Sequence, residues 1–409
     1  MLGWTKGLAA LASLALALTV AAGTAHGQRG KLPPPVRDTF TPVTVSTVGP
    51  STMPVQGTDG RWHVVYELEL ANGKGLPATL QEVSVLDAAR PSRVIARFTG
   101  DDVVARLRTL FPLPADDAVI PPNEMRFFYV ELAFDRRRDV PRHVVHRLHL
   151  LAADNPGATE PTEMTYVAGR FGIRDGRPIV LDPPLRGPNW VAANGCCNPG
   201  IVHRGSIQDL NGGFFDSQRF AIDWMRLDAE GRFFTGDGSD VRQYANYDAP
   251  VYAVADGVVV STLNTLEDQV PGTLPPPTSI TLENVDGNHV VMALGHGLYA
   301  FYAHLREGSV RVRRGQRVRR GQVIGNLGNT GNTSAPHLHF HVMRGPSPLG
   351  SDGVPYVLRR FDLTGQVPID EFNAAPDISG VWGGNRFAPR PQRHRFPLDL
   401  NIVTLPGRG

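Results

Sequence analysis

A run of alternating histidines near the end of the chain is the strongest sign of chemistry in the sequence. His337, His339 and His341 are separated by Leu338 and Phe340. Residues two apart in a β-strand point to the same face, so His337 and His339 project together while the apolar residues turn to the other face. Two imidazoles and a carboxylate from elsewhere suit zinc, which takes three protein ligands and leaves a fourth position for water in a catalytic site. The run therefore predicts a metal site on a strand.

Two earlier stretches hold further residues of the kind that such a site needs. Asp223 lies between apolar neighbours, and His304 follows Tyr302 and Ala303. Short apolar segments punctuated by glycine and proline, without a sustained helical period, predict that these residues lie on β-strands. The relevant strands are expected over Arg219–Met225, Ser279–Leu282, Tyr299–His304 and His337–Met343.

The elements that must position these residues belong to a mainly β chain of 409 residues. From about residue 40 to 180, segments rich in Val, Phe, Tyr and Leu alternate with turn clusters, which predicts a β-sandwich. We therefore expect an all-β fold, with an N-terminal β-sandwich followed by an antiparallel β-sheet domain. The expected divisions are 1–27 for a signal peptide, 28–182 for the sandwich, 183–217 for a linker loop with the cysteine pair and His203, 218–346 for the second domain and 347–409 for a C-terminal extension.

The N-terminal segment and the charge indicate where the protein works. Lys6 is followed by the Ala- and Leu-rich stretch Gly7–Ala22 and then by small residues, which is typical of a secretory signal. The apolar stretch falls short of the roughly 20 residues that span a bilayer, so a retained membrane anchor is the less favoured alternative. The net charge of +2 with scattered basic residues argues against nucleic acid as a partner. We expect an exported protein, periplasmic or extracellular, with no membrane span after signal removal.

The two cysteines are adjacent, at Cys196 and Cys197. On a strand they would point to opposite faces, which makes them a poor chelating pair. We expect either two buried small hydrophobes or a vicinal disulfide that stiffens a loop.

The segment from Gln218 to about Arg344 resembles the lysostaphin-type zinc metallopeptidases of family M23, whose catalytic domains are also called LytM. The stretches that carry the resemblance stand in the order of the family and are Ala221–Trp224, Val251–Val259, Tyr302–Leu305, Gly315–Gly325, Gly328–Gly331 and His337–Phe340. The resemblance implies an antiparallel catalytic sheet, a Zn²⁺ ion and hydrolysis of peptide bonds. It implies that Asp223 and His339 bind zinc and that His304 and His337 assist catalysis.

The expected chemistry suits these residue types. Zinc lowers the pKa of a bound water and polarises a peptide carbonyl, while histidines transfer protons near neutral pH. One position departs from the family, in which a third ligand, His, stands four residues before the Asp. This chain has Arg219 there, and a guanidinium has no lone pair for a metal.

His203 is the expected replacement for the missing ligand, because it lies in the loop that leads into the Asp223 strand. His289 and His296 are weaker candidates near the His304 strand, and His341 lies one strand step beyond His339. A site that lacks the third ligand is the remaining alternative.

The sequence thus predicts an exported zinc metalloendopeptidase that hydrolyses peptide cross-links of peptidoglycan. The alternative is a catalytically degenerate LytM-type protein that binds cell wall or activates another wall hydrolase, and a peptidase for folded proteins is a further possibility. A biotinyl or lipoyl carrier domain does not fit, because no Lys follows Lys74.

Overall fold

The computed structural model describes residues 38–110, 113–198, 200–374, 381–382 and 384–407. The expected signal peptide, residues 1–27, lies outside these described residues. Across the described part, the regular elements are nearly all β-strands, and most strand pairs are antiparallel, which confirms the predicted all-β class. The helices found in that part are too short or too polar to cross a membrane.

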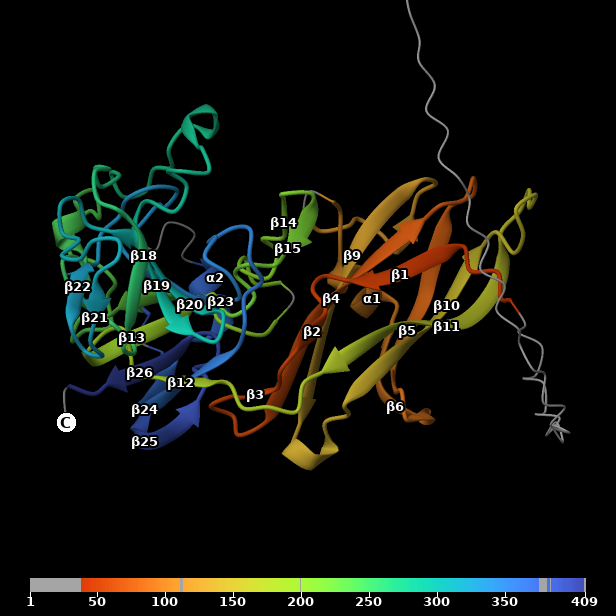
Figure 1. Cartoon of the computed structure of the whole chain (residues 1–409), viewed down its shortest axis with the longest axis horizontal. Coiled ribbons are helices and arrows are strands. Elements are labelled where there is room, and N and C mark those ends of the chain that lie inside the picture. The colour runs from red at the N-terminus through yellow and green to blue at the C-terminus, as the bar shows by residue number, and fades with distance from the viewer. Residues whose placement is uncertain (1–37, 111–112, 199, 375–380, 383, 408–409) are drawn as a thin grey trace, which may run out of the picture. The chain divides into compact units, whose positions relative to one another are not determined.

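Two sheets that share one apolar core form the N-terminal sandwich (Figure 1). The first sheet has the order β1 (Val43–Thr47), β4 (Trp62–Asn72), β9 (Glu124–Phe134) and β7 (Leu107–Arg108), with β3 (Val55–Gln56) beside β4. The second has the order β2 (Ser51–Thr52), β11 (Thr162–Ile173), β10 (His143–Ala152), β5 (Ala78–Asp87) and β6 (Arg90–Thr99), with β8 (Val119–Ile120) beside β5. Alternate residues of β4, such as Tyr66 and Leu68, and of β10, such as Leu148, fill the space between the sheets. This is the period-2 burial that a sandwich requires.

One large sheet carries the residues singled out in the sequence. Its 11 strands run in the order β12 (Ile179–Leu181), β24 (Tyr356–Gln366), β26 (Asn401–Leu405), β13 (Gly187–Ala193), β16 (Ile222–Arg226), β23 (Leu338–Met343), β20 (Leu298–Leu305), β19 (Asn288–Gly295), β18 (Gly257–Leu263) and β21 (Arg317–Val318), with β25 (Asn385–Arg395) beside β24. Smaller elements are α1 (Asp101–Arg106), α2 (Ile369–Ala374), the hairpin β14 (Gln208–Leu210) and β15 (Gly213–Phe215), and the pair β17 (Pro250–Tyr252) and β22 (Val323–Asn326). Strands β16, β23 and β20 are neighbours, so three distant parts of the sequence meet at one place.

The strand register places the predicted ligands on one face. Asp223 lies directly opposite His339 across β16 and β23. Their neighbours Trp224, Leu338 and Phe340 are buried in the core on the other face of the sheet. The alternation of histidine and apolar residues is therefore an alternation between a polar face and the core.

The structure departs from two of the expected local assignments. The stretch 183–217, expected as a linker loop, contains β13, because the apolar run Trp190–Ala193 is buried between β26 and β16. The stretch Ser279–Leu282, expected as a strand, begins at the last residue of a 3-10 turn over Pro277–Ser279. The side chain of Asn284 accepts from Thr281 N–H over 2.7 Å and donates to Ser279 O over 2.8 Å, which occupies backbone groups that a strand would pair, and Leu282 is 63% exposed. In addition, the C-terminal stretch 347–409 supplies β24, β25 and β26 to the large sheet.

Candidate active site

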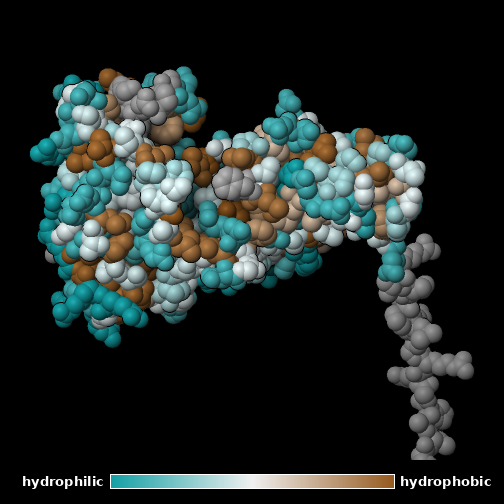
Figure 2. All heavy atoms as spheres, turned by 90° about the horizontal axis from the view of Figure 1, so that it is seen from above, coloured by the Kyte–Doolittle hydropathy of each residue, from teal (hydrophilic) through white to brown (hydrophobic). Residues whose placement is uncertain are grey.

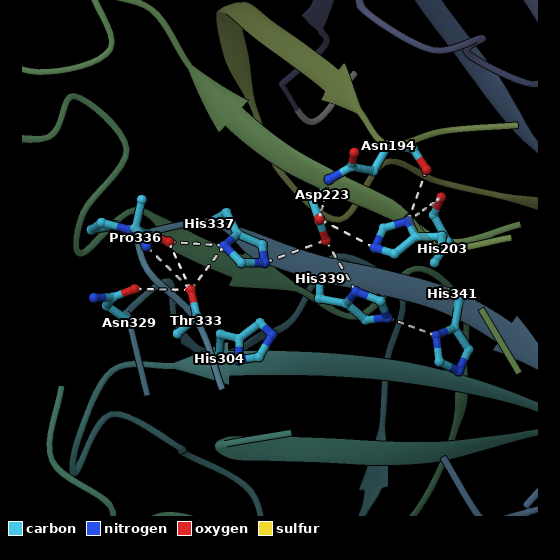
Figure 3. Close-up of polar contacts among 12 residues, drawn as sticks. Asn194, His203, Asp223, His304, Asn329, Thr333, Pro336, His337, His339 and His341 are labelled. Atoms are coloured by element: carbon cyan, nitrogen blue, oxygen red, sulfur yellow. Dashed lines mark hydrogen bonds and ion pairs between the residues drawn. The ribbon is translucent and has the colours of Figure 1, made fainter. Parts of the chain in front are cut away.

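The carboxylate of Asp223 is the centre of the site (Figure 3). Its Oδ2 lies 3.1 Å from His203 Nε2, and Asn194 Nδ2 donates to the same oxygen over 2.9 Å. Its Oδ1 lies 3.3 Å from His337 Nε2 and 3.0 Å from His339 Nδ1. Asp223 and the three histidines are all buried. The structure therefore brings His203 to the site, although it lies 20 residues before Asp223 in the sequence.

Backbone carbonyls orient two of these imidazoles. His203 Nδ1 donates to Asn194 O over 2.8 Å, and His337 Nδ1 donates to Ala335 O over 2.8 Å. Because a carbonyl oxygen only accepts, each Nδ1 carries a proton, and Nε2 is the nitrogen that faces Asp223. Fixing the tautomer through the second ring nitrogen is typical of metal-binding histidines.

His339 has the opposite orientation. Its Nδ1 faces Asp223, while its Nε2 lies 2.9 Å from His341 Nδ1. Burial lowers the pKa of His339 to about 4 and the pKa of His341 well below its usual value, so both rings are neutral at neutral pH. Because the Asp223 carboxylate only accepts, His339 Nδ1 carries the proton and its Nε2 accepts from His341 Nδ1. A metal ion at Nδ1 would replace that proton.

Charge complementarity holds the cluster together. Burial by itself raises the pKa of Asp223, but the charges of His203 and His337 and their hydrogen bonds lower it well below the usual value. Conversely, burial lowers the pKa values of His203 and His337, and Asp223 more than offsets this, so both pKa values are raised. Asp223 is therefore an anion that favours cationic partners, protons or a metal ion, in a buried place.

The geometry of this group fits zinc. His203, Asp223 and His339 each offer one ligand atom, and these atoms lie within 4.8 Å of one another. Ligand atoms at about 2.0–2.2 Å from a tetrahedral zinc stand roughly 3.3 Å apart, which matches the spacing around Asp223. Two imidazole nitrogens and one carboxylate oxygen are also a donor set of catalytic zinc sites with an open fourth position.

His304 lies beside this group, next to His337. The centroids of the two rings are 4.7 Å apart. His304 Nδ1 donates to Thr330 O over 2.8 Å, which leaves the lone pair on Nε2. Burial, together with the charges of His337 and His339, lowers the pKa of His304 well below its usual value. His304 is thus a neutral ring that can accept a proton.

A local distortion of β20 directs His304 to this place. Ala303 lies opposite His339, so in a regular strand the next residue would face the core, as Tyr302 does. Instead, His304 has φ 58, and the pairing of β20 with β19 shifts register there. Its backbone N–H donates to Asp286 O over 3.1 Å. Such bulges redirect a side chain next to functional sites.

The site opens into a cavity of about 680 Å³. Its lining includes His203, Asp223, His304, His337 and His339 together with apolar side chains. Two of these, Val202 and Leu274, are 71% and 62% exposed. Elsewhere, on the face drawn in Figure 2, hydrophilic and hydrophobic residues are interspersed. Polar and apolar side chains thus line the hollow into which the histidines and Asp223 converge.

Residues weighed as other ligands lie outside this group. His289 Nδ1 lies 3.0 Å from Gly287 O, and His296 is in the turn between β19 and β20. Arg219, at the position where the family has a ligand, directs its guanidinium to Glu67, with Nη2 2.6 Å from Oε2. Cys196 and Cys197 form a disulfide, one of the two states expected for them.

Sequence reasoning missed the supporting groups. Asn194, whose side chain donates to Asp223 and whose carbonyl accepts from His203, carries no recognisable pattern. The contribution of the Thr330 and Ala335 carbonyls cannot be recognised in the sequence, because it comes from the backbone and not from the side chains. Of these supporting groups, only His341 can be recognised in the sequence, because strand alternation places it on the same face as His339. In the structure it contacts the His339 ring.

Part of this site lies in a segment that resembles known proteins, whereas His203 and Asp223 precede the matched span. Residues 237–351 match the model of Peptidase family M23, a span that holds His304, His337 and His339. Peptidoglycan DD-endopeptidase ShyA of Vibrio cholerae serotype O1 is 38% identical over 94 residues, which cover 23% of this chain and 17% of the relative. Peptidoglycan DD-endopeptidase ShyC of the same organism is 24% identical over 183 residues, which cover 40% and 37%.

A third relative is glycyl-glycine endopeptidase ALE-1 of Staphylococcus capitis, 32% identical over 109 residues, which cover 26% of this chain and 25% of the relative. The chain thus spans well under two thirds of the length of each of these relatives. The match is confined to one part of the sequence, which includes the strands β20 and β23. This part of the chain, residues 237–351, is therefore similar to Peptidase family M23.

Proposed function

We propose that the protein is an exported zinc metalloendopeptidase that hydrolyses peptide cross-links of peptidoglycan. One observation carries the proposal: the ligand atoms of His203, Asp223 and His339 converge within 4.8 Å, beside two further histidines in one cavity. The three relatives are named for endopeptidase activity, two of them on peptidoglycan. This supports a peptide substrate of the bacterial wall.

His203, Asp223 and His339 are the residues that would hold the zinc. When bound, zinc supplies a water of lowered pKa and polarises the scissile carbonyl. Asn194 and His341 orient these ligands through hydrogen bonds to Asp223 and His339. Outer partners of this kind fix ligand geometry.

The two remaining histidines divide the proton transfers. His304 has its proton on Nδ1, held by Thr330 O, so Nε2 is free to accept a proton from the attacking water. His337 lines the cavity and has a raised pKa, so its Nε2–H, which lies 3.3 Å from Asp223 Oδ1, donates a proton to the oxyanion or to the leaving amine. The low pKa of one ring and the raised pKa of its neighbour fit a base and an acid.

Digestion of peptidoglycan sacculi tests the proposal. The full mature protein is incubated with sacculi, with and without a zinc chelator, and released muropeptides are identified by mass spectrometry. We expect chelator-sensitive release of fragments with new peptide termini, restored by added zinc and lost in Asp223→Ala. Failure of a folded, zinc-loaded protein to release any fragment would contradict the proposal and favour a wall-binding or regulatory protein.

The non-catalytic alternative rested on Arg219. That argument is weakened by the position of His203, whose Nε2 lies 3.1 Å from Asp223 and is available as the third ligand atom.

A further inference from the structure

A buried ion cluster connects the sandwich with the segments that carry the metal site. Glu67, on β4, is completely buried. Its Oε1 lies 2.6 Å from Arg204 Nη2, and its Oε2 accepts from Arg219 Nη2 over 2.6 Å and from Arg219 Nε over 2.8 Å. Arg204 is 0% exposed and Arg219 is 5% exposed. One carboxylate thus contacts two buried guanidinium groups.

This cluster lies on the outer face of β4. Tyr66 and Leu68 belong to the core of the sandwich, whereas Val65 belongs to the core that contains the residues of the large sheet. By strand alternation, Glu67 shares the face of Val65. Glu67 is therefore a residue of the sandwich that projects into the part of the molecule built around the large sheet.

Arg204 ties this carboxylate to the loop that presents His203. It directly follows His203, and its Nη1 donates to Cys197 O over 2.8 Å. The loop begins at Asn194, which contacts both His203 and Asp223. Held at Arg204 and Cys197, the loop has little freedom to move His203 away from Asp223.

Arg219 ties the same carboxylate to the segment that enters β16. It stands four residues before Asp223, and its Nη1 donates to Gly353 O over 3.2 Å. Asp216, completely buried, lies 3.4 Å from Arg219 Nε. Burial and the charge of Glu67 raise the pKa of Asp216 well above its usual value, so Glu67 is the principal counter-ion of the two arginines.

We infer that Glu67 is a positioning residue for the metal centre. It acts through Arg204 on His203 and through Arg219 on Asp223, so the sandwich supplies a group that the zinc site needs. This inference rests on the proposed zinc function. A buried charge without its partner strongly destabilises the surrounding structure. Loss of Glu67 would release both arginines, and with them the ligand loop.

Zinc affinity of the full chain tests this inference. Glu67→Gln removes the charge, and Glu67→Asp keeps the charge but is one methylene too short to contact both arginines. We expect both to weaken zinc binding by about 10- to 100-fold, the usual effect of losing an outer support of a metal site. Affinity is measured by competition with a chromogenic chelator. The visible absorption of the Co²⁺-loaded protein reports the ligand geometry and should change as well.

A matched control separates positioning from general stability. Glu82, in the same sandwich, pairs with Arg147 at 3.1 Å and Arg97 at 3.5 Å, within the sandwich. Glu82→Gln should leave zinc affinity and the Co²⁺ spectrum unchanged. If Glu67→Gln does not fold, Glu67→Asp and Arg204→Lys serve in its place, with folding followed by circular dichroism.

The outcomes distinguish the two proposals. A wild-type protein that fails to bind zinc would refute the proposed function before any variant is compared. Wild-type zinc binding together with unchanged affinity and spectrum in folded Glu67 variants would overturn the role of Glu67 alone. Weakened binding with an altered spectrum supports it.

Discussion

Arg219 and Asp223 are four residues apart in the chain, yet their side chains belong to two different clusters. The guanidinium of Arg219 lies 2.6 Å from Glu67, whereas the carboxylate of Asp223 lies 3.1 Å from His203. A metal ligand introduced at position 219 would therefore not take the place of His203, which the structure positions from the preceding loop.

His203→Ala should reduce zinc affinity by about 100-fold or more, because it removes one of the three proposed ligand atoms. Adding Arg219→His to this variant should not restore binding, since the side chain at 219 lies among Glu67, Gly353 and Val48. Chelator competition measures both. Recovery of near wild-type affinity in the double variant would show that position 219 reaches the metal.

His304→Ala and His337→Ala should lower kcat by about 10²- to 10⁴-fold while keeping bound zinc, because neither belongs to the ligand group. Metal content is measured by atomic emission and activity by muropeptide release. Loss of zinc from either variant would instead identify that histidine as a ligand.

His341→Leu should weaken zinc binding by about 10- to 100-fold, since His339 Nε2 loses its hydrogen-bond partner and the ring loses its fixed orientation. His149→Ala is the control, because His149 pairs with Glu163 in the sandwich. Equal affinities in the two variants would argue against a role for His341 in orienting His339.

Asp286→Asn should change the pH dependence of stability. Burial raises the pKa of Asp286 from 3.8 to about 7. Between these values the folded state keeps a proton that the unfolded state has lost, so this group's contribution to stability falls as pH rises from about 4 to 7. The Asp286→Asn variant has no carboxyl group to ionise, so its stability does not fall in this way. It should be more stable than wild type at pH 8 by upwards of about 1 kcal/mol.

The measurement for Asp286 is thermal unfolding of wild type and variant at pH 4 and pH 8. We expect nearly equal midpoints at pH 4 and a higher midpoint for Asp286→Asn at pH 8. The same difference in unfolding midpoint at both pH values would mean that the pKa of Asp286 is not raised.

The sequence was sufficient for features that depend on local alternation. The spacing of His337 and His339 predicts their shared face, and the apolar neighbours of Asp223 predict a strand; both hold in the structure. His304 was placed on a strand, but its orientation depends on a positive φ that alternation cannot reveal.

Features that depend on distant pairing could not be predicted in this way. Glu67 and its two arginines are separated by 137 and 152 residues, and a buried glutamate on β4 has no local signature. The sequence favours a loop where the structure has β13, because the partners of this strand, β16 and β26, come from later parts of the chain.

The position of β13 also sets an order for biosynthesis. It lies between β16, which carries Asp223, and β26, which ends at Leu405. A ribosome makes the chain from the N-terminus, so β26, the second neighbour of β13, is made more than 200 residues after β13. The sheet behind Asp223 and His339 therefore lacks one of its inner strands until residue 405 has been made.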